Sequence, residues 1–199
     1  MCRFRINVCE SIGLISSLRA AGVLSATRNS CPRVKFHVIV APGEKRRVAR
    51  LLRCCFEHAN GSSTRLRTYA FDKSNVTAPI RVRAKEGAHG KLASPLNFAR
   101  FYLERILSPR VRKLVYIDVD TIIWGDLCNL FDSTHKQERP PYLAAVQMGH
   151  LSTWLEPEAL RMAQLDGSRP GFNAGVCVIN LAGWRAAKVT SSIEYPRTH

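Results

Sequence analysis

Short β-branched runs alternate with amphipathic helical patterns along this chain, and the alternation limits the folds that it can adopt. The run VKFHVIV at 34–40 is stopped by Pro42 and Gly43 and predicts a strand. The next segment, 43–58, has apolar side chains on one side and basic ones largely on the other, as in an amphipathic helix. Further strands are predicted at LRTYAF, 113–117, YLAAV and FNAGVCVIN, and further helices over 8–26, 94–107, around 155–165 and from Leu181.

Strands that alternate with helices predict βαβ units, and therefore an α/β fold whose mostly parallel sheet is covered by helices on both faces. A chain of 199 residues is long enough for one well-packed domain. We find no repeat and no linker, so residues 1–199 are expected to form a single domain. The segment 72–94 has no sustained period and predicts an irregular loop.

Two carboxylates stand one residue apart in the apolar run LVYIDVDTIIWGD. Asp118 and Asp120 follow a predicted buried strand, and ligands gather at the carboxyl ends of such strands. Like charges this close repel one another unless a cation lies between them. Oxygen ligands suit a hard ion such as Mg²⁺ or Mn²⁺ that also binds a substrate's phosphates. These residues therefore predict a metal site, with an ordinary surface turn as the alternative.

The charge is strongly basic and unevenly distributed. The formal net charge is +15; residues 1–113 hold 23 Lys and Arg against 6 Asp and Glu, whereas residues 114–199 hold 7 against 9. This asymmetry favours an anionic partner, which could be nucleic acid, a membrane surface, a phosphorylated small molecule or an acidic glycan, although a solvated basic surface explains it as well. Because no nucleic-acid-binding fingerprint accompanies the charge, we expect no specific nucleic-acid partner.

Seven cysteines have no metal-binding spacing, and Cys128 and Cys177 stand in apolar surroundings that suggest small buried side chains. The first 22 residues are too polar for a secretory signal or a membrane span, and we expect no membrane segment in this chain.

Three blocks carry a family resemblance: SPLNFARFYL at 94–103, KLVYIDVDTIIWGDL at 113–127 and GFNAGVCVINLAGWR at 171–185. In order and approximate spacing they resemble glycosyltransferase family 8, and the likeness is clearest over 34–184. The resemblance implies a GT-A fold and a retaining transferase that uses Mn²⁺ (or Mg²⁺) and moves a hexose-type sugar from a UDP-sugar to a glycan or glycoconjugate. It also implies the Golgi or secretory pathway, because family members commonly lie there.

Carried over residue by residue, the resemblance implies that Asp118 and Asp120 hold the metal. It implies that Arg100 contacts the donor sugar or phosphate, and that Asn173 and Ala174 contact the donor sugar. The residues themselves leave plainer alternatives open: Arg100 as the polar face of a helix, and Asn173 as a turn residue before a strand. No carboxylate is identified as a nucleophile, and Asp166 is the weakest of candidates.

Two departures from the family pattern affect the predicted function. The start, MCRFRIN, does not match the family's first strand, and no His-containing final block with the third metal ligand precedes His199. We therefore expect a domain that is incomplete at both ends. The alternative functions are a catalytically inactive truncated relative, or a basic protein that binds nucleic acid or an acidic glycan.

Overall fold

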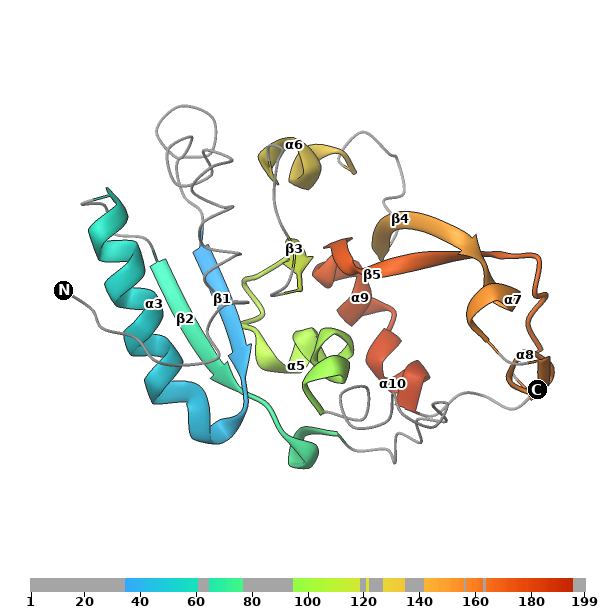
Figure 1. The fold of residues 1–199 in the computed structure, drawn as a ribbon, viewed down its shortest axis with the longest axis horizontal. Helices are drawn as coiled ribbons and strands as arrows, with labels where there is room; N and C mark the ends of the chain where they lie inside the picture. Colours follow the sequence, from blue (N-terminus) through green and yellow to red (C-terminus); the bar gives the residue numbers. More distant parts are fainter. Residues whose placement is uncertain are drawn as a thin grey trace.

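The computed structural model of the chain describes residues 35–60, 65–76, 95–118, 121, 127–134, 142–155, 157–162 and 164–194. The described residues form two small sheets and the helices packed against them (Figure 1). The predicted helix over 8–26 lies outside them. In chain order the elements, with η for a 3-10 helix, are β1 (Lys35–Val40), η1 (Pro42–Glu44), α3 (Lys45–Asn60), β2 (Arg65–Ala70), η2 (Lys73–Asn75), η3 (Pro95–Tyr102), α5 (Leu103–Ile106), β3 (Leu114–Ile117), α6 (Leu127–Asp132), β4 (Leu143–His150), α7 (Leu151–Trp154), α8 (Pro157–Met162), β5 (Pro170–Ile179), α9 (Leu181–Ala186) and α10 (Val189–Glu194).

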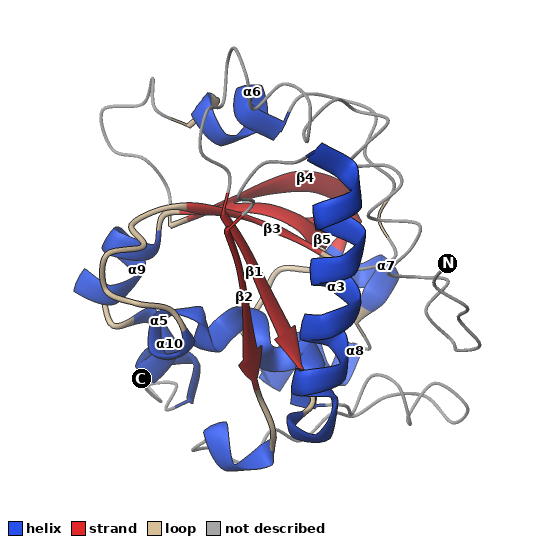
Figure 2. Cartoon of the chain, turned by 90° about the vertical axis from the view of Figure 1, so that its left-hand side faces the viewer, coloured by secondary structure: helices blue, strands red, loops and turns tan. Residues whose placement is uncertain are grey.

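Strands β1 and β2 and helix α3 form the βαβ unit that the first strand and helix patterns predict. The strands are parallel and in register from Lys35 opposite Arg65 to Val40 opposite Ala70. Helix α3 covers one face of this pair, where Leu52 packs against apolar side chains of both strands (Figure 2). The alternation along β1 explains the contact, because every second residue points toward the helix.

The second sheet has the strand order β3-β5-β4 and is antiparallel. In Figure 2 its strands run steeply across β1 and β2. The expectation of a mostly parallel sheet therefore holds for the β1–β2 pair and needs correction for β3, β4 and β5. A local sequence pattern shows that a segment forms a strand. Whether two strands are parallel or antiparallel depends on the connection between them. Here the connection through α7 and α8 brings β5 back antiparallel to β4.

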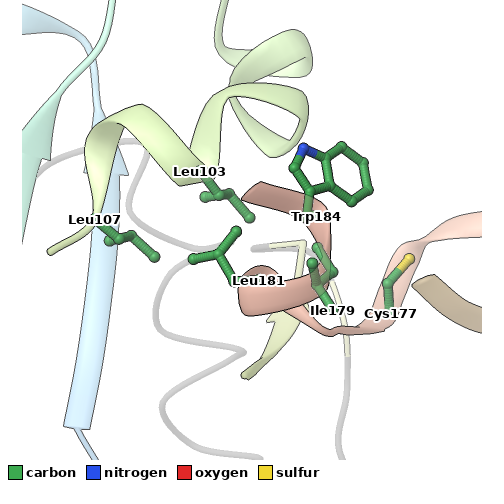
Figure 3. Packing of buried hydrophobic residues seen from close by; sticks show 6 residues of the cluster. All are labelled: Leu103, Leu107, Cys177, Ile179, Leu181 and Trp184. Atoms are coloured by element: carbon green, nitrogen blue, oxygen red, sulfur yellow. The ribbon is translucent and has the colours of Figure 1, made fainter. Parts of the chain in front are cut away.

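The main hydrophobic core lies where α5, α9 and β5 meet. The side chains of Leu103, Leu181 and Trp184 converge there with Ile179 (Figure 3). A hydrogen-bonded chain of buried polar groups crosses the same region: Trp184 Nε1–H donates to the Thr190 hydroxyl at 3.0 Å, and that hydroxyl donates to the Phe101 carbonyl at 2.7 Å. Paired in this way, the polar groups are buried without the cost of a lost hydrogen bond.

Arg185 fastens the segment that leads from α5 into β3. Its guanidinium donates to the backbone carbonyls of Leu107 at 3.1 Å and Val111 at 2.7 Å, with longer contacts to three further carbonyls between 104 and 109. These carbonyls include those that the end of a helix leaves without an intrahelical partner. A single side chain of α9 therefore fixes the turn from which β3 starts.

Two local predictions change in detail. The helix predicted over 94–107 is present, but its first part is the 3-10 helix η3 and α5 supplies the α-helical part. Cys177 is free and buried, as expected, whereas Cys128 is disulfide-bonded, so its interpretation as a simple buried thiol is wrong. Pairing with a cysteine elsewhere in the chain leaves no local trace in the sequence. None of the helices in the described ranges is long and apolar enough to cross a membrane.

Candidate active site

Asp118 stands directly after β3, at the carboxyl end of this strand. Its backbone N–H donates to the Gly175 carbonyl at 2.8 Å, which ties the end of β3 to β5. Its carboxylate accepts the Tyr116 O–H at 2.8 Å, and a third of the side chain is exposed. Because side chains two residues apart on a strand share a face, the tyrosine reaches the carboxylate without distortion. Asp118 is therefore held in place and still open to a ligand.

Arg100 extends from η3 to the same point. Its Nη1–H donates to the Ala174 carbonyl at 2.6 Å, and its Nη2 lies 3.3 Å from Asp118 Oδ1. Its Nε–H donates to the Asn97 carbonyl at 3.2 Å, and the guanidinium lies over the Tyr116 ring, 4.9 Å from the ring centroid. With 15% of its side chain exposed, Arg100 is fixed on several sides and brings a cation to the carboxylate.

A bulge in β5 brings the remaining predicted residues to this point. Gln147 of β4 is opposite Phe172, whereas Ala145 is opposite Cys177. One residue of β4 therefore faces four residues of β5, 173–176, and these four are displaced from regular pairing with β4. Bulges of this kind redirect strand residues and are common beside active sites. The displaced segment includes Ala174, whose carbonyl receives Arg100.

Asn173 and Gly175 stabilise the bulge from within. Asn173 Oδ1 accepts the Gly175 N–H at 2.7 Å, which replaces a lost ladder bond and leaves the exposed amide NH₂ as a donor. A Cβ on Gly175 would lie 3.0 Å from Asn173 Oδ1 and 3.1 Å from Asp118 Oδ2. Both distances are shorter than ordinary van der Waals contact, so glycine makes the space in which these two side chains sit.

Burial keeps the Tyr116 phenol and the Cys177 thiol near Asp118 neutral. It raises the pKa of the Tyr116 phenol well above its ordinary value, against a smaller lowering by the Arg100 cation, and the Asp118 carboxylate adds to the rise. Burial also raises the pKa of the Cys177 thiol, which is again partly offset by Arg100. At neutral pH Tyr116 therefore remains an O–H donor to Asp118.

The chemistry of these side chains fits a hard cation. A carboxylate has about four lone-pair positions, and the hydrogen bonds from Tyr116 and Arg100 leave some of them for a metal. Within the described ranges no group of three His, Cys, Asp or Glu residues gathers. Asp120 lies outside those ranges. Asp118 is thus the one predicted metal ligand whose surroundings the structure describes.

The structure brings Arg100, Asp118 and Ala174 into contact, and it places Asn173 beside them through Gly175. These contacts do not test the chemical roles that the resemblance implies. Sequence reasoning missed two residues of the site, Tyr116 and Gly175. The signal for Tyr116 was present, since two-residue spacing puts it on the same strand face as Asp118. The signal for Gly175 was weaker: a glycine inside a strand pattern suggests a bulge.

The arrangement of sheets and helices is that of the GT-A glycosyltransferases. The crystal structure of the galactosyltransferase LgtC in complex with donor and acceptor sugar analogs is similar with a TM-score of 0.57 and 17% identity, over 97% of this chain and 63% of that one. The apo form of mouse xyloside xylosyltransferase 1 is similar with a TM-score of 0.58 and 12% identity, over 94% and 66%. At these identities the likeness shows the fold, and the expected α/β GT-A class is confirmed.

The sequence model of glycosyl transferase family 8 matches residues 15–196 of this chain. The chain therefore belongs to this family. Glycosyltransferase 8 domain-containing protein 1 of Bos taurus is 28% identical over 195 residues, which is 87% of this chain and 49% of that protein. A protein of Arabidopsis thaliana named probable galacturonosyltransferase-like 9 is 30% identical over 184 residues, 87% of this chain and 45% of that protein. The chain therefore spans about half the length of the curated relatives that it matches. The family expected from the three sequence blocks is confirmed.

Proposed function

We propose that residues 1–199 belong to a single catalytic domain, of which they form part, in a metal-dependent, retaining glycosyltransferase. In this proposal the chain moves a hexose-type sugar from a UDP-sugar to a glycan or glycoconjugate. Membership of glycosyl transferase family 8 supports the reaction class. The observation that carries the proposal is the contact of Arg100 with both Asp118 and the bulged strand at Ala174. By family resemblance we also propose the Golgi or secretory pathway as its location.

Asp118 and Asp120 would hold a divalent cation, Mn²⁺ or Mg²⁺, which supplies positive charge where the diphosphate leaves. Arg100 adds a fixed guanidinium at the same place, and its contacts hold that charge still before the reaction begins. Such preorganised charge stabilises a developing anion more than mobile charge does. Tyr116 orients Asp118 through its O–H.

Asn173 and Ala174 are proposed to contact the donor sugar. The Asn173 amide NH₂ is a donor for a sugar hydroxyl, because its Oδ1 is already used by the Gly175 N–H. The Ala174 carbonyl is used by Arg100, so Ala174 also acts by holding that arginine. Fixed contacts of this kind hold the donor sugar in the orientation that the transfer needs, and such orientation raises the reaction rate.

The first experiment is calorimetric titration of the folded chain with UDP, with and without Mn²⁺. We expect binding that needs Mn²⁺ and that weakens at least about tenfold in Asp118→Asn and in Asp120→Asn, because each change removes a charged ligand. Glu44→Gln is the matched control: it removes one carboxylate from an exposed pair with Arg47, and such pairs contribute little. Equal binding by all four proteins would contradict the proposed site.

A second candidate function is supported by the basic first half of the chain, which suits nucleic acid or an acidic glycan without catalysis. A binder that works through charge loses affinity steeply as salt rises and is indifferent to Asp118→Asn. Measuring both dependences with an oligonucleotide and with UDP–Mn²⁺ separates the two functions. If turnover is found, the anomeric configuration of the product, read by NMR, tests retention.

A further inference from the structure

A cavity of about 330 Å³ lies apart from the cluster around Asp118. None of its described lining residues belongs to that cluster, so it needs an explanation of its own. Its volume lies at the small end of the range for ligand pockets, about 300 to 1,000 Å³. The described lining residues are Lys45, Tyr69, Ala70, Phe71, Asn75, Tyr102, Arg105 and Ile106.

The cavity stands at the carboxyl ends of two parallel strands. β2 ends at Ala70, and the N–H of the next residue, Phe71, donates to the Val40 carbonyl at the end of β1 at 2.9 Å. Lys45 is the first residue of the 16-residue helix α3, which follows β1. In open α/β sheets this edge is where ligands bind, and a helix that begins there adds positive partial charge.

The polar part of the lining is cationic. It has two cations, Lys45 and Arg105, and no Asp or Glu among its described members. The Arg105 guanidinium is held in a two-point contact with the Glu194 carboxylate, at 2.9 and 2.7 Å, and lies over the Tyr102 ring. No described residue forms an ion pair with the exposed Lys45 side chain. Because Glu194 offsets the charge of Arg105, Lys45 supplies the net positive charge of the described cavity wall.

Asn75 adds a neutral donor to this wall. Its Oδ1 accepts the Asp72 N–H at 2.8 Å. This hydrogen bond sets the orientation of the amide and leaves its NH₂ as a donor. An ammonium group and an amide NH₂ both suit the oxygens of a carboxylate or phosphate. The lining thus combines charge for an anion with a donor that also suits a hydroxyl.

The apolar part of the lining consists of Ala70, Ile106 and three aromatic residues. Phe71 and Tyr102 are almost fully buried and lie 5.6 Å apart, and Tyr69 is fixed by a 2.8 Å hydrogen bond between its hydroxyl and His37 Nδ1. Because Phe71 and Tyr102 are almost fully buried, the half-buried Tyr69 is the ring that can contact the C–H face of a sugar, at little cost in conformational entropy. A lining that combines Lys45, the Asn75 amide and the Tyr69 ring suits a small ring that carries one anionic group.

We propose that this cavity binds an anionic monosaccharide unit, one pyranose ring bearing a carboxylate or a phosphate. Only the choice of a sugar as the carrier of the anion rests on the proposed glycosyl transfer; the charge and the size come from the cavity itself. The cavity is separate from the proposed metal and donor site, and it gives the basic half of the chain a defined ligand.

Ligand-observed NMR titration of the full chain tests this with four probes: galactose, galacturonate, galactose 6-phosphate and inorganic phosphate. We expect galacturonate, galactose 6-phosphate or both to bind about tenfold tighter than galactose, the effect of one charge-assisted hydrogen bond. Whichever anionic sugar binds tighter identifies the anionic group. Galactose binding as tightly as both anionic sugars, or inorganic phosphate binding as tightly as either, would overturn the proposal.

Lys45→Gln should weaken the anionic sugars about tenfold and leave galactose unchanged. The matched control is Arg46→Gln, which removes a cation from the next, exposed residue of α3 and should change nothing. An equal loss of affinity for the anionic sugars in Arg46→Gln would mean that general surface charge causes the effect, and it would overturn the proposal. Asp118→Asn should leave this binding intact even if UDP–Mn²⁺ binding is lost, so failure of the proposed transferase and failure of this cavity give different results.

Discussion

Replacing Gly175 by alanine tests whether the space between Asn173 and Asp118 is needed for ligand binding. The added Cβ would lie 3.0 Å from Asn173 Oδ1 and 3.1 Å from Asp118 Oδ2. Both atoms are the ends of side chains, so they can move by a few tenths of an ångström while the backbone stays in place. Gly175 does not have a left-handed backbone, so crowding and not φ strain decides the outcome.

The magnitudes separate binding from stability. Overpacking costs about 1 to 3 kcal/mol, and the lower end applies here because the crowded atoms are mobile. Alanine also gains about 0.4 to 1 kcal/mol by reducing the entropy of the unfolded chain. The free energy of unfolding should therefore change by less than about 1 kcal/mol. Displacing the Asp118 carboxylate, the proposed metal ligand, by a few tenths of an ångström should weaken UDP–Mn²⁺ binding about tenfold, given that about 1 Å can cost a hundredfold in rate.

Calorimetry with UDP and Mn²⁺ measures the binding, and urea denaturation measures the free energy of unfolding. Gly43→Ala is the matched control, because a Cβ there meets nothing within 4 Å. That control should gain about 0.4 to 1 kcal/mol of stability and bind UDP–Mn²⁺ as before. If Gly175→Ala behaves like Gly43→Ala in both assays, the crowding argument is refuted.

Three further changes test the supports of the fold and the site. Tyr116→Phe keeps the ring but removes the O–H donor to Asp118. Urea denaturation should show a free energy of unfolding lower by about 1.5 kcal/mol, and calorimetry should show weaker UDP–Mn²⁺ binding. No change in either measurement would contradict the role of Tyr116. Arg185→Lys cannot span the backbone carbonyls of 104–111, so urea denaturation should show a loss of about 2 kcal/mol, and an unchanged transition would sink the idea. Burial and two neighbouring cations hold the pKa of His37 below 6.5, so the unfolded chain binds the proton more readily. The free energy of unfolding should thus fall as pH drops below about 6.5 toward the folded-state pKa, and His37→Gln should flatten this slope in urea titrations at several pH values.

Elements whose pattern is local were predictable from the sequence. β1 was expected at 34–40 and is found at Lys35–Val40, because a run rich in β-branched residues and ended by Pro42 and Gly43 is a local signal for a strand. The 3-10 form of η3 was not predictable, since apolar spacing of three and four residues suits either kind of helix. The direction of β5 relative to its neighbours was not predictable either, because it depends on the path of the chain between strands.

The candidate site divides in the same way. Tyr116 and Asp118 are two residues apart, so their contact follows from strand geometry and could have been predicted. Arg100 reaches Ala174 across 74 residues, and no local pattern predicts that contact. It depends on a bulge that Asn173 and Gly175 stabilise, and on a turn that Arg185 fixes from α9. Contacts between the separate sequence blocks thus decide where Arg100 and Asp118 meet, and substitutions at Gly175 and Arg185 test the site more sharply than further changes to the carboxylates.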